Sequence, residues 1–243
     1  MFKDLLAGIG QLVYPPSKNR IQSCRAFDFT QKFIIMDSYS LEANRPPFCV
    51  KCSRNLGDAP AFSACPTCRK FKPVFDFAWS ALLYKEPLKQ LIHNFKYGQK
   101  TYLRHPFGAV ITQFVDTYRF DIAQFDAIVP VALHPARLRE RGYNQSALLA
   151  GHVAKSYNIN LYTNTLKRHR ATKPQSALDR KQRWTNIRGA FKIMRSNELE
   201  NKNILLVDDL LTTGATASEC AAALKAAGAK TVGVLTLAIA PVG

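Results

Sequence analysis

The segment of residues 204–216 constrains the fold of this 243-residue chain more than any other segment. Its first four residues are apolar, and an unbroken apolar run is typical of a parallel strand that is buried on both faces. A polar turn follows, and the small residues after it predict a helix from about Ala215 to Ala227, ended by Gly228. A buried strand joined to a helix in this way is the repeating unit of α/β folds.

The turn combines two kinds of ligand-binding group. Asp208 and Asp209 place two carboxylates directly after the apolar run, and carboxylates suit a divalent cation and the hydroxyls of a sugar. The helix N-terminus offers unpaired N–H groups to a phosphate, with the hydroxyls of Thr212 and Thr213 and the open backbone of Gly214 beside them. This combination indicates a site for a phosphorylated sugar with its metal. The alternative is an ordinary strand-turn-helix in which a threonine caps the helix and the aspartates are solvated.

The same alternation of strand and helix is predicted along the rest of the chain. It predicts an α/β fold with a mainly parallel sheet, whose ligands would lie beyond the carboxyl ends of the strands. The expected strands are 75–84, 126–132, 159–162, 204–207 and 231–239, and the expected helices are 2–13, 85–97, 102–118, 136–157 and 215–227. A strand-rich piece is expected at 25–41 and a basic polar stretch at 167–188. No P-loop motif and no G-x-G-x-x-G motif is present.

Four of the six cysteines form two Cys-x-x-Cys pairs that are separated by twelve residues. This spacing predicts a structural zinc site in which four thiolates fill the tetrahedral shell. Two disulfides are the alternative, which the lack of a secretion signal disfavours. The predicted ligands are Cys49, Cys52, Cys65 and Cys68, whereas Cys24 is expected to be unpaired and Cys220 to be a core residue.

The net charge of +17 is concentrated between residues 134 and 195, where fourteen Lys and Arg face two acidic residues. A polyphosphate, a nucleic acid or an anionic membrane is the expected partner of such a surplus, and a basic surface for solubility is the alternative. No apolar run approaches the roughly 20 residues that cross a bilayer, and residues 5–13 do not resemble a signal peptide. We therefore expect a cytoplasmic protein without an integral membrane segment.

Several separated motifs resemble known proteins. Residues 207–216 resemble the phosphoribosyl pyrophosphate (PRPP) motif of type I phosphoribosyltransferases. Residues 128–134 and 137–146 resemble the ComF family of competence-associated proteins, which place a zinc module before the phosphoribosyltransferase domain. The resemblance extends over about residues 45–240. It implies a sheet of the type I phosphoribosyltransferase kind, with an N-terminal zinc-module region at 1–72 and a phosphoribosyltransferase-like domain at 73–243.

The resemblance also implies the residues of the site. PRPP would bind together with Mg2+, with Asp208 and Asp209 as the catalytic carboxylates, and an unidentified acceptor would displace pyrophosphate from C1 of the ribose. The other PRPP-binding residues would be Leu210, Leu211, Thr212, Thr213, Gly214, Ala215 and Thr216. By position, the pyrophosphate loop and a mobile lid would contribute Ala132, Leu133, Arg139, Arg141, Arg168 and Arg170.

Resemblance to competence proteins points to DNA uptake and natural transformation, with single-stranded DNA and competence or DNA-processing proteins as partners. The predicted nucleic-acid contacts are Arg168, Arg170, Lys173, Arg180 and Arg183, and the aromatic residues among them are Tyr143, Tyr157, Tyr162 and Trp184. These aromatic residues have a second interpretation as core residues. Two further functions stay open: a dedicated phosphoribosyltransferase with an unidentified acceptor, and an adaptor that docks on DNA-processing machinery through its zinc module.

Overall fold

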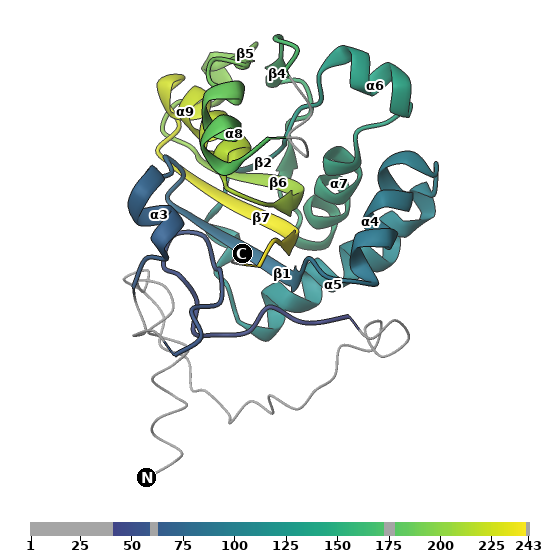
Figure 1. Ribbon diagram of the computed structural model, residues 1–243. Coiled ribbons are helices and arrows are strands. Elements are labelled where there is room, and N and C mark those ends of the chain that lie inside the picture. The colour runs from purple at the N-terminus through teal and green to yellow at the C-terminus, as the bar shows by residue number, and fades with distance from the viewer. Residues whose placement is uncertain (1–40, 59–62, 173–177, 242–243) are drawn as a thin grey trace.

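A five-stranded sheet forms the centre of the protein in the computed structural model, which describes residues 41–58, 63–172 and 178–241 (Figure 1). The strand order is β1-β7-β6-β2-β3, and every neighbouring pair is parallel. The strands are β1 (Phe77–Leu83), β2 (Ala127–Pro130), β3 (Asn160–Leu161), β6 (Asn203–Leu211) and β7 (Thr231–Ile239). The predicted α/β fold with a mainly parallel sheet is confirmed.

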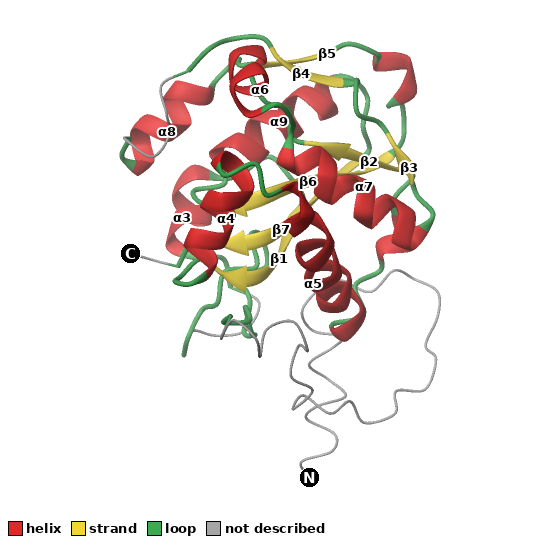
Figure 2. Cartoon of the chain, turned by 90° about the vertical axis from the view of Figure 1, so that its right-hand side faces the viewer, coloured by secondary structure: helices red, strands yellow, loops and turns green. Residues whose placement is uncertain are grey.

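Helices cover both faces of the sheet, as Figure 2 shows from the side. One face carries α4 (Leu88–Tyr97), α5 (Arg104–Thr117) and α7 (Gln145–Tyr157). The other face carries α9 (Ala215–Ala226), and α8 (Arg180–Ile187) packs on α9. The shorter elements are α3 (Pro66–Phe71), η1 (Thr101–Leu103), η2 (Ile122–Gln124), α6 (Pro135–Arg141), β4 (Leu166–Arg168), β5 (Phe191–Ile193) and η4 (Ser196–Glu198).

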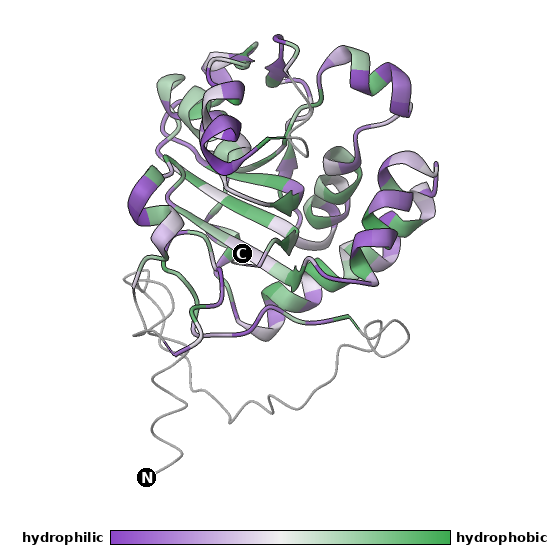
Figure 3. Cartoon of the chain, in the orientation of Figure 1, coloured by the Kyte–Doolittle hydropathy of each residue, from purple (hydrophilic) through white to green (hydrophobic). Residues whose placement is uncertain are grey.

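Strand β6 supplies both hydrophobic cores because successive side chains of a strand point to opposite faces. Leu205 and Val207 pack into the core beneath α5 and α7, while Ile204 and Leu206 pack into the core beneath α9. Figure 3 shows the central strands as mainly hydrophobic and α6 and α8 as mainly hydrophilic. The sheet is thus buried on both faces, as the apolar run predicts.

Most of the predicted elements lie at or near their predicted bounds. The last strand, β7, matches its prediction at both ends. The helix predicted at 215–227 is α9, which ends one residue earlier, and Gly228 follows it with a φ of +96°. The strand predicted at 75–84 is β1, and the helix predicted at 102–118 is η1 followed by α5.

The prediction of one continuous helix at 136–157 is wrong. The segment forms α6 and α7, which are separated at Gly142. Gly142 has a φ of +81°, a left-handed conformation that ends α6 and that glycine adopts without a steric penalty. Asn144 then begins α7, because its side-chain oxygen accepts the N–H of Ser146 at 3.0 Å.

The basic polar stretch predicted at 167–188 contains a helix and most of a strand. Strand β4 pairs in antiparallel fashion with β5, which joins the two ends of this region into a separate small sheet. Helix α8 begins at a capping box in which Asp179 and Gln182 exchange hydrogen bonds. The stretch therefore holds a strand and a helix, and residues 173–177 lie outside the described part of the chain.

Three sequence predictions concern residues that the structure does not describe. They are the helix at 2–13, the strand-rich piece at 25–41 apart from Leu41, and the state of Cys24. Among the described helices, none combines the length and the apolar character that crossing a membrane requires.

Candidate functional site

Asp208 and Asp209 lie where β6 extends past its shorter neighbour β2. The last β2–β6 pair joins Pro130 to Val207, whereas on the other side Asp208 still pairs with Thr236 of β7. The expectation that the strand ends before the aspartates is wrong, because pairing with β7 continues through Leu211. The carboxylates therefore project from a strand beyond the end of β2, at the carboxyl edge of the sheet.

Asp209 is 2% exposed and has two side-chain partners from different helices. Lys96, near the end of α4, forms an ion pair with Oδ2, and Gln145, at the start of α7, donates from Nε2 to Oδ1 at 3.1 Å. A cation and an amide thus compensate this buried charge within the protein.

Asp208 is half-buried and accepts two hydrogen bonds at the same oxygen, Oδ1. Ser146 donates from its hydroxyl at 2.7 Å, and the backbone N–H of Asp209 donates at 2.9 Å. The break between α6 and α7 is what positions these partners, because it directs the first turn of α7 at the end of β6.

The pKa values of the two aspartates move in opposite directions. Burial, and then the negative charge of Asp209, raises the pKa of Asp208 to about 7. Burial opposes the ionisation of Asp209 as well, but the charge and hydrogen bond of Lys96 outweigh it and keep the pKa of Asp209 below its usual value. Asp208 is therefore the carboxyl group of the pair that titrates near neutral pH.

The turn from β6 to α9 leaves its backbone open to the close approach of a ligand at Gly214. Gly214 precedes α9 with a φ of +82°, and the hydroxyl of Thr213 accepts the N–H of Ala215 at 3.3 Å. Thr212 and Thr216 are half-buried, while Thr213 is buried. The N-terminus of α9 is thus bordered by threonine hydroxyls, an arrangement that suits a phosphate.

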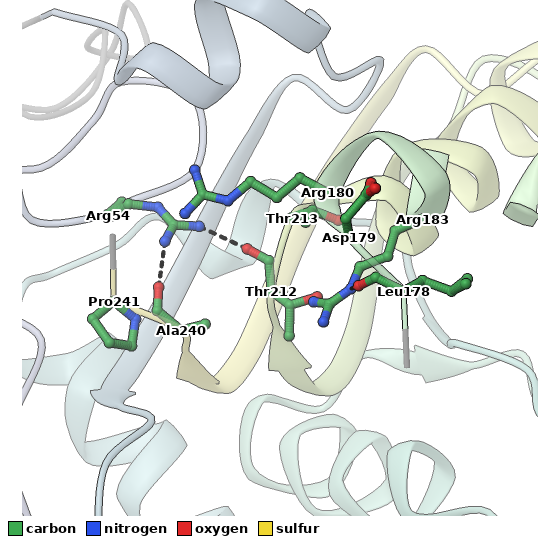
Figure 4. A pocket seen from close by; sticks show the side chains of 9 residues that line it. All are labelled: Arg54, Leu178, Asp179, Arg180, Arg183, Thr212, Thr213, Ala240 and Pro241. Carbon is green, nitrogen blue, oxygen red and sulfur yellow. Dashed lines mark hydrogen bonds between the residues drawn. The ribbon is translucent and has the colours of Figure 1, made fainter. Parts of the chain in front are cut away.

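Arg54, from the cysteine-rich segment, donates hydrogen bonds to the backbone of this turn. Its Nη2 donates to the carbonyl of Thr212 at 2.6 Å, and its Nη1 donates to the carbonyl of Ala240 just after β7 (Figure 4). Arg54 is 5% exposed. It therefore joins the ends of β6 and β7 to the cysteine-rich segment through one buried guanidinium.

The loop after β2 and helix α6 lead from the sheet to the start of α7, whose first turn contacts the carboxylates. Ala132 and Leu133 are half-buried in the loop, and His134 caps α6 by accepting the N–H of Ala136 at 3.3 Å. Arg141 donates to the side-chain oxygen of Gln145 and lies 4.9 Å from the ring centre of Tyr97, whereas Arg139 is exposed. The two arginines point differently, as their i, i+2 spacing requires.

The four predicted zinc ligands come together. Their ligand atoms all lie within 4.8 Å of one another, and Cys52 Sγ and Cys65 Sγ are 3.7 Å apart. A tetrahedron with zinc–sulfur bonds of about 2.3 Å has sulfur–sulfur edges of roughly 3.8 Å. The backbone N–H of Cys65 also donates to Cys49 Sγ at 3.2 Å. The cluster can hold a metal ion, and Cys220 is a separate, buried core residue as predicted.

Comparisons with known proteins agree with this architecture. The family model described as "Phosphoribosyl transferase domain" matches residues 144–243. Competence protein F of Haemophilus influenzae is 32% identical over 195 residues, which cover 79% of this chain and 84% of that protein. The chain belongs to the ComF family.

Two other relatives extend the family. The DNA utilization protein YhgH of Salmonella typhi is 30% identical over 79% of this chain and 84% of that protein. Competence protein ComFC of Streptococcus pneumoniae is 27% identical over 63% of this chain and 64% of that protein. This ComF chain therefore has a phosphoribosyltransferase-type domain, as the sequence motifs predict.

The predicted lid arginines of this ComF chain have intramolecular partners. Arg168 donates to the hydroxyl of Thr172 and lies 5.7 Å from the ring centre of Phe191. Burial lowers the pKa of Arg168, and the charge of Asp208 partly offsets this effect. Arg170 donates to the carbonyls of Asn186 and Arg188 at 2.8 and 2.6 Å, which caps the C-terminus of α8.

The other predicted nucleic-acid residues lie around α8. Arg180 and Arg183 belong to that helix, and Lys173 lies outside the described residues. The four aromatic residues of this region have structural roles. Tyr143 donates to the carbonyl of Phe95, Tyr157 to Asp116 Oδ1 at 2.8 Å, Tyr162 accepts from Lys202 at 2.9 Å, and Trp184 stacks on Phe71 at 5.2 Å.

Sequence reasoning missed three residues that shape the site: Lys96, Ser146 and Arg54. Lys96 stands on a helix whose periodicity indicates only its apolar face, and the sequence carries no sign that the cation points at Asp209. Ser146 is the last residue of the ComF-like motif at 137–146, and this position is the only sequence feature that could have indicated its role in the site. Arg54 follows a predicted zinc ligand by two residues, which gives no indication of its contact with Thr212.

Proposed function

We propose that this ComF chain binds PRPP with Mg2+ at the end of β6 and acts in DNA uptake on single-stranded DNA. The observation that carries the proposal is the turn after β6, where two carboxylates precede a helix N-terminus bordered by threonines. Carboxylates complement the ribose hydroxyls and the N-terminus complements the 5′-phosphate of one ligand.

The carboxylates fit the ribose because Asp208 receives both of its hydrogen bonds at Oδ1, so that Oδ2 can accept from a hydroxyl. Asp209, which Lys96 and Gln145 hold in place, fixes the backbone position of its neighbour. The same oxygen-rich donor set fits Mg2+, which keeps several of its waters and is bound through one or two carboxylates. Bound Mg2+ would neutralise charge on the pyrophosphate.

Cations around the carboxylates support binding of the pyrophosphate. Arg141 donates to Gln145, and the charge of Asp208 acts to raise the pKa of Arg168 against the effect of burial. We propose that both guanidiniums bind the pyrophosphate, because charge-assisted hydrogen bonds to guanidinium are among the stronger ones in proteins.

Calorimetric titration of PRPP with Mg2+ tests this site. We expect binding by the parent protein and by Glu200→Gln, which removes an exposed acidic group elsewhere, and loss of binding in the Asp208→Asn, Asp209→Asn double variant. Absence of binding by folded, metal-loaded parent protein would contradict the proposal.

We propose that the four-cysteine cluster holds Zn2+ in a structural role. The sulfur–sulfur distance and the N–H donated to Cys49 support zinc. Four thiolates leave no open position on the ion, so a catalytic function for it is not part of the proposal.

The proposed action on single-stranded DNA rests on the charge distribution and on the names of the relatives, competence and DNA utilization proteins. Phosphate contacts make affinity fall steeply as salt concentration rises. Fluorescence anisotropy with a labelled oligonucleotide at increasing salt measures this effect. An affinity independent of salt would contradict the proposal.

A dedicated phosphoribosyltransferase is the second candidate. The carboxylates at the end of β6 favour it, because they would hold the ribose hydroxyls next to C1, where an acceptor displaces pyrophosphate. Release of pyrophosphate from PRPP on addition of an acceptor, lost in the double aspartate variant, would establish this activity.

A further inference from the structure

Two tyrosines on the connection between α4 and α5 have exposed rings. Tyr97, the last residue of α4, is 54% exposed, and Tyr102, in η1, is 61% exposed. Among the phenylalanine, tyrosine and tryptophan residues that the structure describes, only these two are exposed. Exposed tyrosine rings are enriched where proteins bind partners, because they offer a large apolar face together with a polar hydroxyl.

Backbone hydrogen bonds hold the connection in a compact turn. The N–H of Thr101 donates to the carbonyl of Gln99 at 2.9 Å, and the N–H of Leu103 donates to that of Lys100 at 3.1 Å. Leu103 is 5% exposed and packs into the core beneath α5 and α7. The ring of Tyr102 therefore stands on a turn that core packing fixes, and a partner can bind it without first ordering the turn.

Cations without carboxylate partners flank the two rings. Lys100 and Arg104 are exposed, and neither forms an ion pair with a described residue. Arg141 lies 4.9 Å from the ring centre of Tyr97 and donates to an amide oxygen rather than to a carboxylate. Residues 85–104 contain five Lys and Arg and a single acidic residue. The surroundings of the rings are therefore positively charged, which favours an anionic partner.

The end of α4 lies next to the carboxylates of β6. Lys96, which precedes Tyr97, forms the ion pair with Asp209. Tyr143, in the link between α6 and α7, donates to the carbonyl of Phe95. The exposed rings thus stand near the carboxylates, and no residue of the phosphate turn belongs to their surface.

The four aromatic residues that the sequence predicts as DNA contacts offer no comparable rings. All four are half-buried, and each contacts a side chain or a carbonyl of the protein itself. A base that stacks on an aromatic ring would therefore find it on the connection between α4 and α5.

We propose that Tyr97, Lys100, Tyr102, Arg104 and Arg141 form a surface that binds single-stranded DNA, which we call the two-tyrosine surface. Bases stack on the two rings, and the cations contact the phosphates. This combination binds single strands without sequence preference, because every base has a face that can stack. The inference rests on the single-stranded DNA part of the proposed function and names the surface that performs it.

Anisotropy titrations with a labelled dT oligonucleotide of about ten nucleotides test the stacking. Tyr102→Leu removes the ring, whereas Tyr102→Phe keeps it, and neither substitution changes the charge. We expect Tyr102→Leu to weaken binding by about tenfold and Tyr102→Phe to retain the affinity of the parent protein. Equal affinities of the two variants would overturn the proposal. Because Tyr102 is exposed, both variants should keep the melting temperature of the parent protein.

Arg104→Gln and Lys230→Gln form a matched pair that tests the phosphate contacts. Both remove one exposed positive charge, but Lys230 precedes β7 at the amino edge of the sheet. The logarithm of the affinity for a single strand falls with the logarithm of the salt concentration, with a slope of about 0.7 for each phosphate contact. We expect Arg104→Gln to reduce the slope by about this amount and Lys230→Gln to leave it unchanged. Equal effects would assign the binding to general basic charge and overturn the proposal.

The parent protein separates failure of this inference from failure of the proposed function. If the parent protein binds the oligonucleotide and the substitutions of Tyr102 and Arg104 have no effect, the inference is wrong and the single-stranded DNA proposal stands. If the parent protein does not bind the oligonucleotide, both fail. Light scattering covers the remaining occupant: if Tyr102→Leu reduces self-association and leaves the affinity for the oligonucleotide unchanged, the rings belong to a contact between copies of this chain, and the inference is wrong.

Discussion

The aspartate pair and the four-cysteine cluster differ in how their charge is compensated. The aspartates at 208 and 209 already have Lys96, Gln145 and Ser146 as partners within the protein. The four cysteines have chiefly one another, together with the backbone N–H of Cys65. The mutual contacts lower the pKa of Cys49 and raise those of Cys52 and Cys68.

This difference has consequences for the two proposed sites. The charge of the aspartate pair is compensated by side chains of the protein itself, and the proposed sugar or hydrated cation would take up the remaining acceptor positions. A fully deprotonated cluster of four thiolates is unstable without a metal, because like charges in close contact repel. We therefore expect metal removal to affect the fold and ligand removal to leave it intact.

The largest effect is expected from removing the zinc ion that we propose for the cysteine cluster. Binding free energies of structural zinc are about 10 kcal/mol or more, and they contribute directly to folding. Chelation, or Cys65→Ser with Cys68→Ser, should unfold the segment around α3, seen as a lower melting temperature and release of about one zinc per chain. Cys220→Ala, which removes a buried thiol outside the cluster, should leave the zinc content unchanged. A chelated protein with an unchanged melting temperature would contradict a structural role.

The next largest effect is expected from Lys96→Met. It removes the cation beside Asp209, and breaking a buried ion pair costs about 3–5 kcal/mol of the free energy of unfolding. Lys85→Met is the matched control, because the Lys85–Glu42 pair is exposed and its loss should cost less than about 1 kcal/mol. Urea unfolding of both variants measures the difference.

The pH dependence of Lys96→Met has a defined sign. In the parent protein the pKa of Asp209 is depressed, so the stability that this group contributes is present above its unfolded value of 3.8 and is lost as the pH falls. Without Lys96, burial raises the pKa of Asp209 instead, and the variant should lose stability as the pH rises. A double variant, Lys96→Met with Asp209→Asn, should recover much of the loss.

Ser146→Ala is expected to have a smaller effect that depends on pH. The pKa of Asp208 is raised to about 7 from 3.8. Between these two pH values, Asp208 is therefore protonated in the folded protein and ionised in the unfolded chain. The free energy of unfolding therefore falls as the pH rises from about 4 to about 7. Ser146 lowers this pKa, so its removal should extend the fall to higher pH.

Unfolding of Ser146→Ala at pH values on either side of this range measures the shift. The hydrogen bond of Ser146 to ionised Asp208 is worth about 1.5–3 kcal/mol, and less when the carboxyl group is protonated. Ser156→Ala provides the control, because Ser156 lies on the same helix and donates to the carbonyl of His152. An equal loss at low and at high pH would show that Ser146 does not act through the charge of Asp208.

Much of this site could be predicted from the sequence, because its parts follow one another along the chain. The strand, the carboxylates and the helix N-terminus at 204–216 are local, and apolar periodicity with a glycine at the turn indicates all three. The four cysteines were predicted from their spacing alone. The bound of the strand was wrong because pairing with β7, a contact between distant segments, decides where β6 ends.

The partners of the carboxylates could not be predicted in this way. Lys96 is separated from Asp209 by more than a hundred residues, and only the packing of α4 against the sheet brings them together. The prediction of one helix at 136–157 also failed to identify Gln145 and Ser146 as partners of the aspartates. Because the segment breaks at Gly142, the side chains of Gln145 and Ser146 contact the aspartates. The sequence does not indicate this break, since a glycine within a helical pattern can also adopt a helical φ.

The smallest effect is expected from Phe71→Leu, which tests whether the two clusters are energetically separate. Phe71 of α3 stacks on Trp184 of α8 at an interplanar angle of 3°, and such a pair contributes about 0.5–1.5 kcal/mol beyond its burial. The chain has two tryptophans, of which Trp79 is 2% exposed, so quenching of fluorescence by iodide reports mainly on Trp184. We expect greater quenching and a stability loss of about 1 kcal/mol, with unchanged binding of Mg2+–PRPP. A loss of PRPP binding would mean that the contact between α3 and α8 reaches the carboxylates, since the substitution itself touches neither Asp208 nor Asp209.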